Sequence, residues 1–489
     1  MTRTRYPKSF LILMSFATLT VPAFAQLRSR PVPYPVFETP QFQRAVEAGT
    51  RSRDGNPGPN YWTNRARYDI DVTLSPVSRK LAGTSTVVYQ NNSPDALNRI
   101  VVNLYQNLFK EGEVRNRSLV PTGGFNLTCT FVDGSPIVEA ASMREPGYVI
   151  YGTKAIIALR DPVTPGGSVE LRFCWDFEVP DAESKIRMGT DGEVFYLGYW
   201  YPQVAVNDDV SAVPEQRDGW DYDRYLGSGE FYMGYADYDV RITVPSGWLV
   251  PATGTLENPD DVLSQQTKDL LEAARTGPDV VNVVTDSTRD EALVPSVTGA
   301  ATWHYKAENV RDFAFAASNK FVWDATFAFV GEGAGYQGSD RAMINAFYRP
   351  GAGSWEKSAE FAKFSIENMS ERIMPYPWPH MTTIEGIIQG GMEYPMMTLI
   401  GGSRNERSLF GVTYHELVHM WFPMIVGTNE KAYTWMDEGL ASFNTNEGHF
   451  DFWPDTTVWN PERQAYFRIA GSGMEVESMR HADQYPLDT

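Results

Sequence analysis

The chain has 489 residues, 42% hydrophobic and 13% aromatic, which is enough for about two or three domains with substantial cores. It carries 42 lysines and arginines against 61 aspartates and glutamates, a formal net charge of −19. Such an acidic surface repels phosphate backbones, so we expect no nucleic-acid partner.

Residues 1–25 have the pattern of a secretory signal peptide. Three basic residues precede a mostly apolar run over residues 10–20, and Ala23-Phe24-Ala25 fits the small-x-small pattern of a cleavage site. The apolar run is too short to anchor the chain, so we expect no stable membrane insertion. We therefore expect export to a periplasm or to the extracellular space, with cleavage after Ala25.

Cys129 and Cys174 are the two cysteines of the chain, and neither has the spacing of a metal ligand. In an oxidising compartment they could form a disulfide. The sequence leaves the pairing open, because it does not tell whether the two Cβ atoms lie close enough.

Residues 26–61 are rich in proline, arginine, serine and glycine without sustained periodicity, so we expect an extended arm. Residues 62–320 then alternate short strand-like segments with turns, which predicts an antiparallel β domain. Residues 261–276 interrupt this pattern as an amphipathic helix that stops at Gly277, and we interpret them as an insertion without chemistry. The strand-like segments are 68–74, 84–89, 100–105, 148–159, 169–177, 238–244 and 302–306.

The periodicity changes after residue 320. Apolar residues recur at helical spacing from Trp355 to Ile373, and this helix should end before the prolines that follow. Residues 381–388 then read as a strand that leads into Gly390 and Gly391. Two glycines let a backbone approach a ligand closely, and an exposed strand edge can pair with an extended peptide.

The segment His415-Glu416-Leu417-Val418-His419 indicates a metal site. Residues four apart on a helix are turned by about 400°, so both imidazoles leave the same face and can hold one ion. Glu416 lies about 100° round the helix, where a general base can reach a water on that ion.

A catalytic zinc needs a third protein ligand and one open position. Glu438 follows His419 after eighteen residues and is our candidate for this ligand. Thr434 and Asp437 have the spacing of an N-cap pair, which would place Glu438 in the first turn of a second helix.

These motifs, with Trp421 two residues after the second histidine, resemble the gluzincin aminopeptidases related to aminopeptidase N and the leukotriene hydrolase. The segment at residues 390–393 is similar to the Gly-x-Met-Glu segment of that family, although Tyr394 stands where many members have Asn. The resemblance implies one Zn²⁺ per chain with Glu416 as the base, and Glu393 holding the free α-ammonium of a peptide. It further implies the zinc ligands His415, His419 and Glu438, and a substrate-lining backbone at Gly390, Gly391 and Met392.

The resemblance also implies an α+β multidomain fold. A saddle-like antiparallel β domain over residues 62–320 would precede a thermolysin-like mixed α/β catalytic domain over residues 321–489. In the family the β domain contributes a polar residue beside the substrate amine, for which Gln203 is our candidate. The oxyanion-stabilising tyrosine of the family falls roughly sixty residues past the third ligand, beyond Thr489 and later than Tyr485, so we expect an incomplete catalytic domain.

The function that follows is removal of N-terminal residues from peptides by a zinc aminopeptidase. Two alternatives remain open. A gluzincin endopeptidase would share the zinc ligands but have no use for Glu393, and a catalytically impaired member of the fold would only bind peptides.

Overall fold

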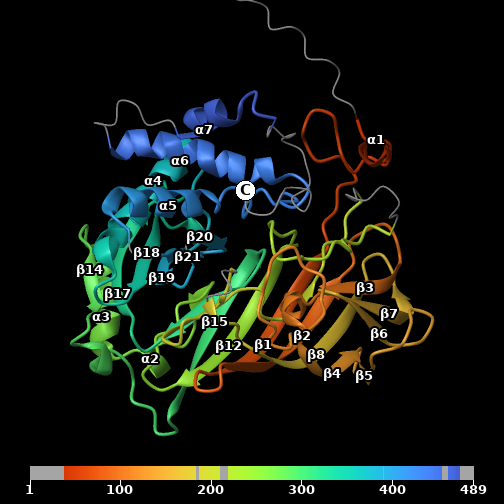
Figure 1. The fold of residues 1–489 in the computed structure, drawn as a ribbon, viewed down its shortest axis with the longest axis horizontal. Coiled ribbons are helices and arrows are strands. Elements are labelled where there is room, and N and C mark those ends of the chain that lie inside the picture. The colour runs from red at the N-terminus through yellow and green to blue at the C-terminus, as the bar shows by residue number, and fades with distance from the viewer. Residues whose placement is uncertain are drawn as a thin grey trace, which may run out of the picture.

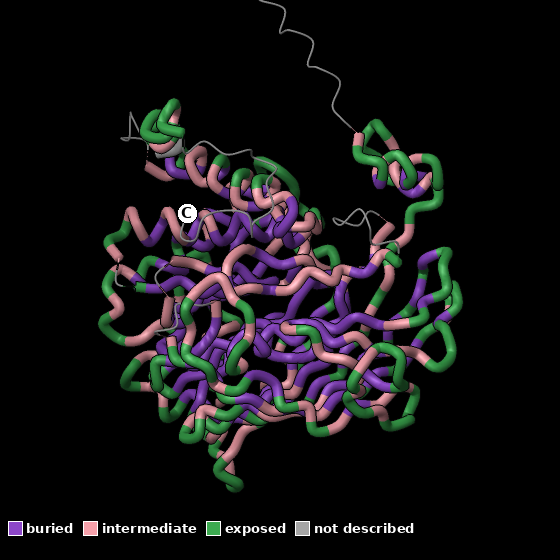
Figure 2. The backbone as a smooth tube through the Cα atoms, turned by 45° about the vertical axis from the view of Figure 1, so that its right-hand side comes forward, coloured by how far each residue is buried: buried purple, intermediate pink, exposed green. Residues whose placement is uncertain are grey.

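The fold is that of a computed structural model, which describes residues 38–182, 187–209, 218–388, 390–402, 404–453 and 461–473. The signal-peptide prediction and Tyr485 lie outside these residues. Within them the chain forms a mixed α/β structure with four β-sheets, and the C-terminal helices lie together on one side of the molecule (Figure 1). Figure 2 shows that the buried backbone is concentrated in the sheets and in the helix faces that meet them.

The largest sheet has eight strands in the order β13-β15-β12-β1-β2-β8-β4-β5. Buried and exposed residues alternate along its strands, as expected when one face of the sheet packs on the core. In β1 the side chains of Tyr68, Ile70 and Val72 are buried, and the residues between them are exposed. The pairs are antiparallel as predicted, except that β1 pairs with β12 in parallel, because the chain returns to this sheet after a long excursion. The strands are β1 (Arg65–Ser75), β2 (Lys80–Gln90), β4 (Asn126–Val132), β5 (Ser135–Pro136), β8 (Ser168–Glu178), β12 (Ala236–Pro245), β13 (Thr255–Leu256) and β15 (Ala300–Val310).

Two smaller sheets complete the N-terminal part. One has the order β11-β3-β7-β6, with β3 (Leu97–Asn103), β6 (Tyr148–Tyr151), β7 (Lys154–Val163) and β11 (Gln203–Val204). The other has the order β16-β10-β9, with β9 (Gly189–Thr190), β10 (Val194–Leu197) and β16 (Phe315–Ser318). The single strand expected over residues 148–159 is wrong: a turn at Gly152, whose φ is +58°, divides it into a hairpin.

The fourth sheet carries part of the site. Its order is β14-β17-β18-β19-β21-β20, so β20 is an edge strand, as expected for the segment after residue 388. Its strands are β14 (Val281–Val284), β17 (Val322–Phe329), β18 (Arg341–Tyr348), β19 (His380–Gly386), β20 (Gly391–Tyr394) and β21 (Met397–Gly401). Helix α4 (Ser358–Arg372) packs on β17, β18 and β19, while α5 (Glu406–Val418) contacts β20 and β21 and packs against α6 (Glu438–Phe452).

Three sequence expectations need correction. Residues 26–61 include a helix, α1 (Pro40–Glu47), because a proline opens it and the Thr39 hydroxyl caps it. Residues 261–276 form two helices, α2 (Pro259–Val262) and α3 (Gln265–Thr276), because Leu263 is extended and Ser264 caps a new start. The segment is also more than an insertion, since α3 packs on β14 and β17 and β14 extends the sheet that carries β20.

A disulfide between Cys129 and Cys174 joins β4 to β8, with the two Cα atoms 4.8 Å apart, so the pairing that the sequence left open occurs. Helix α7 (Pro461–Ile469) is the last described element. Among the described helices, none has the length and apolar character that a membrane span requires.

Candidate metal centre and amine-binding cluster

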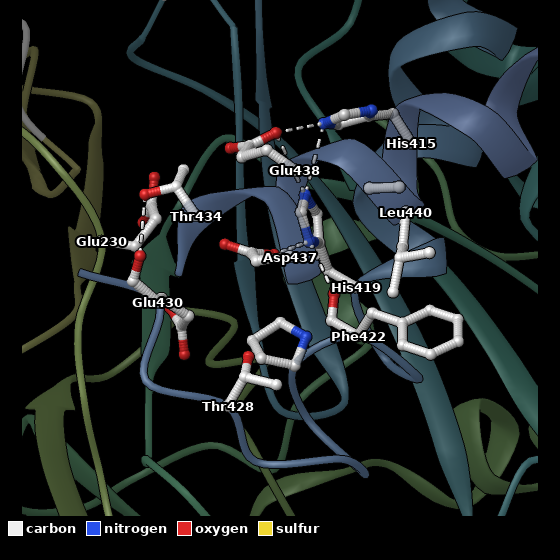
Figure 3. A network of polar contacts seen from close by, with 12 residues as sticks. Glu230, His415, His419, Phe422, Thr428, Glu430, Thr434, Asp437, Glu438 and Leu440 are labelled. Carbon is white, nitrogen blue, oxygen red and sulfur yellow. Dashed lines mark hydrogen bonds and ion pairs between the residues drawn. The ribbon is translucent and has the colours of Figure 1, made fainter. Parts of the chain in front are cut away.

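Three of the predicted ligand atoms converge at the junction of α5 and α6 (Figure 3). The Nε2 atom of His415 lies 3.1 Å from Oε2 of Glu438 and 3.3 Å from Nε2 of His419. The distance from Nε2 of His419 to Oε2 of Glu438 is 3.9 Å. Helical spacing brings the two imidazoles together, and Glu438 is the first residue of α6, as predicted.

This arrangement fits a zinc ion. Tetrahedral zinc with bonds of about 2.0–2.1 Å separates its ligand atoms by about 3.3–3.4 Å, close to the observed spacing. Burial opposes a charge on His419, but the carboxylates of Glu393, Asp437 and Glu438 outweigh it and raise the pKa of this imidazole well above its usual value. The carboxylates around His419 therefore favour a positive charge at its imidazole. Burial raises the pKa of Glu438, but the hydrogen bond from His415 and the charges of both imidazoles outweigh it and lower this pKa to about 2, so the carboxylate is ionised, as a zinc ligand must be.

Asp437 orients one of the imidazoles. Its buried carboxylate lies 2.7 Å from Nδ1 of His419, and the backbone carbonyl of Phe422 lies 2.9 Å from the same atom (Figure 3). A proton on Nδ1 leaves Nε2 free to bind a metal. The predicted N-cap pair is wrong: the Thr434 hydroxyl donates to the Glu430 carbonyl, and α6 has no side-chain cap because Asp437 is turned towards His419.

Glu416 lies against strand β20. The residue is only 5% exposed, and burial raises the pKa of its carboxyl group. The strand can approach because residue 391 is glycine: a Cβ atom there would lie 1.9 Å from Oε1 of Glu416. A Cβ atom on Gly390, by contrast, would have no described residue beyond its chain neighbours within 4 Å. One oxygen of Glu416, one of Glu393 and a ring nitrogen of His419 lie within 4.8 Å of one another.

Glu393, on β20, belongs to a second cluster with Glu230 and Glu430. The three residues are 4–5% exposed, and each offers an oxygen within 4.8 Å of the other two. Arg187 forms an ion pair with Glu230, and Arg311 forms one with Glu430. Burial raises the pKa of Glu230 to about 7 and that of Glu430 to about 8, and it raises the pKa of Glu393 well above its usual value.

The structure brings together His415, His419, Glu438, Glu416 and Glu393, which the sequence singled out. Gly390 and Gly391 form the entry to β20, and Met392 is buried with its sulfur 2.7 Å from a guanidinium nitrogen of Arg187. The Tyr394 hydroxyl donates to the backbone carbonyl of Arg187, so the residue that replaces the family's Asn joins β20 to the N-terminal part.

Gln203, the predicted polar residue from the β domain beside the substrate amine, does not reach the cluster of Glu393. The amide of Gln203 is buried and donates to the backbone carbonyl of Arg311, within the β domain. Glu230 and Arg187 instead reach the cluster, both from irregular segments. Their sequence surroundings carry no periodicity or motif that would have selected them.

No known protein-family model matches the chain, and no curated protein matches its sequence. Among solved structures, it is similar to a mutant M1 zinc metallopeptidase from Deinococcus radiodurans, with a TM-score of 0.53 and 16% identity over 88% of this chain and 81% of that chain. It is also similar to a two-domain M1 zinc metallopeptidase mutant bound to L-tryptophan, with a TM-score of 0.51 and 16% identity over 85% of this chain and 77% of that chain. At this identity the likeness concerns the fold: the chain has the two-domain fold of M1 zinc metallopeptidases.

Proposed function

We propose that the chain is a zinc-dependent aminopeptidase that removes residues from the free N-terminus of peptides. The observation that carries the proposal is the position of Glu393, whose carboxylate lies within 4.8 Å of Glu416 and His419. In a peptide the α-nitrogen and the carbon of the first carbonyl are about 2.5 Å apart. An ammonium held at Glu393 therefore presents the first peptide bond, rather than an internal one, to the base and the metal.

The charge of the cluster supports an ammonium ligand. Glu230, Glu393 and Glu430 carry three negative charges when ionised, and Arg187 and Arg311 neutralise two of them. One negative charge remains for one α-ammonium group. A cation that enters the cluster would favour the ionised carboxylates over the protonated forms that burial favours.

In the reaction, His415, His419 and Glu438 would hold the zinc. When bound, zinc supplies a Lewis acid and lowers the pKa of water enough for attack at neutral pH. Glu416 accepts the proton of the attacking water at its carboxylate and donates it to the departing amine. Glu393 fixes the amino terminus, and the reaction depends on this anchor because rate falls steeply when reacting atoms are misplaced.

The test is an assay of full-length protein on aminoacyl chromogenic substrates and on their N-acetylated forms, with and without a chelator. We expect chelator-sensitive release that is fast from the free substrates and far slower from their acetylated forms. We also expect Glu416→Gln to abolish turnover while zinc stays bound. Equal cleavage of the acetylated substrates would support the endopeptidase alternative, and an active Glu416→Gln variant would refute the role of Glu416.

We also propose that the protein is exported after cleavage behind Ala25. The disulfide between Cys129 and Cys174 supports this location, because such bonds persist in oxidising compartments. N-terminal sequencing of the mature protein should begin at Gln26, and recovery of an intact Met1 in the cytosol would contradict the proposal.

A further inference from the structure

A buried ion pair joins the N-terminal sheet to the segment between the zinc-binding helices. Arg311 directly follows β15, and Glu430 lies between His419 and Glu438 in the chain. Their side chains are 2% and 5% exposed, and Nη1 of Arg311 contacts Oε1 of Glu430 at 2.5 Å. Two charges at this depth are tolerated only when their remaining donors and acceptors are also satisfied.

The remaining groups of this pair are bonded to backbone from both parts of the chain. Nε of Arg311 donates to the carbonyl of Met233 at 3.2 Å, and its two Nη atoms donate to the carbonyls of Pro423 at 3.3 Å and Thr428 at 3.2 Å. The second oxygen of Glu430 accepts from the backbone N–H of Phe231 at 3.4 Å. The pair thus fastens residues 231–233 to residues 423–430.

Glu230 directly precedes the fastened segment in the chain. Oε1 of Glu230 pairs with Arg187, but Oε2 is buried without a hydrogen-bond partner among the described residues. A buried carboxylate oxygen with no partner is costly, so this oxygen is suited to a ligand that brings a donor. The Glu230 carboxylate lies beside Glu393, so a shift of the backbone at residues 231–233 would move it relative to that residue.

We propose that Arg311 and Glu430 are positioning residues that hold Glu230 against Glu393, and that this junction between the two parts of the chain sets the requirement for a free amino terminus. The proposal rests on the proposed function, because it concerns the same amine-binding cluster. It adds that the preference for a free over a blocked amino terminus is lost when the Arg311–Glu430 ion pair is removed, although the candidate zinc ligands and the proposed base are unchanged.

The test compares free and N-acetylated substrates in full-length variants. We expect Arg311→Met to lower the ratio of kcat/KM for free over acetylated substrate at least tenfold, with zinc content unchanged. Because one charge left alone at this depth destabilises the fold, the double variant Arg311→Met with Glu430→Leu removes both charges and should show the same loss. Arg311→Lys keeps the charge but reaches fewer acceptors, so its ratio should lie between those of the wild type and Arg311→Met.

The matched control is Tyr235→Phe. The Tyr235 hydroxyl donates to the carbonyls of Met424 and Ile425. Tyr235→Phe therefore removes a different hydrogen-bonded contact between the N-terminal part and residues 423–430, and it changes no residue of the amine-binding cluster. We expect its ratio to be that of the wild type. The proposal is overturned if folded Arg311 variants keep the ratio, if both substrates lose kcat/KM equally, or if Tyr235→Phe lowers the ratio as much as Arg311→Met.

A binding measurement separates this inference from the proposed function. Zinc-loaded Glu416→Gln protein, with and without the Arg311 change, is titrated calorimetrically with Ala-Ala-Ala and with its N-acetylated form. Preferential binding of the free peptide that Arg311→Met abolishes supports the inference even if the wild type turns over no substrate. Preferential binding that survives Arg311→Met overturns the inference and leaves the proposed function intact.

Discussion

Replacing Gly391 by alanine should disable the proposed base without touching the metal ligands. The added Cβ would lie 1.9 Å from Oε1, 2.2 Å from Cδ and 2.5 Å from Cγ of Glu416. Ordinary contact begins near 3.4 Å, so the carboxylate has to retreat by roughly 1.5 Å (3.4 − 1.9). A glutamate side chain can move, so we expect the fold to survive.

This displacement of the Glu416 carboxylate should lower the reaction rate. Misplacement by about 1 Å costs about 10²-fold in rate, which corresponds to about 2.7 kcal/mol of transition-state stabilisation. We therefore expect Gly391→Ala to lower kcat at least about 10²-fold. His415 and His419 lie on the helix rather than on β20, so zinc content should not change.

Gly390→Ala is the matched control, because no described residue beyond its chain neighbours comes within 4 Å of the Cβ position there. Gly391 does not have a positive φ, so alanine there does not strain the backbone. The assay is steady-state hydrolysis of one aminoacyl substrate by the two variants, with zinc measured in parallel. Gly391→Ala activity within threefold of the wild type, or equal losses in both variants, would refute the placement of Glu416 against β20.

Three further results are expected. Asp437→Asn should weaken zinc binding about 10–100-fold in a chelator competition, because Asp437 orients His419; unchanged affinity would contradict this role. Burial raises the pKa of Asp312 to about 7 from 3.8, so the folded state holds a proton that the unfolded state releases, and stability falls as pH rises from about 4 to about 7. Asp312→Asn should abolish this loss and stabilise the protein at pH 8 by at most about 4 kcal/mol, with no gain at pH 3, as urea unfolding at the two pH values would measure. Replacing both Cys129 and Cys174 by serine opens a loop with a sequence separation of 45 and should cost about 4 kcal/mol in urea unfolding; an unchanged midpoint would contradict a stabilising disulfide.

The convergence of the candidate metal ligands could be predicted because it depends on local geometry. His415 and His419 share a helix face whatever surrounds the helix, and Glu438 begins the next helix. The role of Asp437 could not be predicted in the same way. Its sequence position suits an N-cap, and only the packing of α6 against α5 turns its carboxylate to His419.

The rest of the fold and of the amine cluster depends on contacts between distant segments. Strand β14 reads as part of the N-terminal region but pairs with β17, which no local periodicity indicates. Glu230 and Arg187 come from irregular segments and meet β20 only through the packing of the two parts of the chain. A resemblance to a motif predicts that some polar group arrives from the β domain, but it does not say which one, and Gln203 was the wrong choice.

Both parts of the chain therefore supply charged side chains to the amine-binding cluster. Glu393 and Glu430 belong to the C-terminal part, whereas both guanidinium groups of the cluster, on Arg187 and Arg311, come from the N-terminal part. Buried carboxylates without these partners would take up protons, and a protonated Glu393 has no charge with which to attract an ammonium. Under the proposed function, the C-terminal part alone would keep the candidate zinc ligands and Glu416, but it would lose the negative charge that attracts a free amino terminus. The exopeptidase specificity that we propose therefore depends on the contact between the two parts.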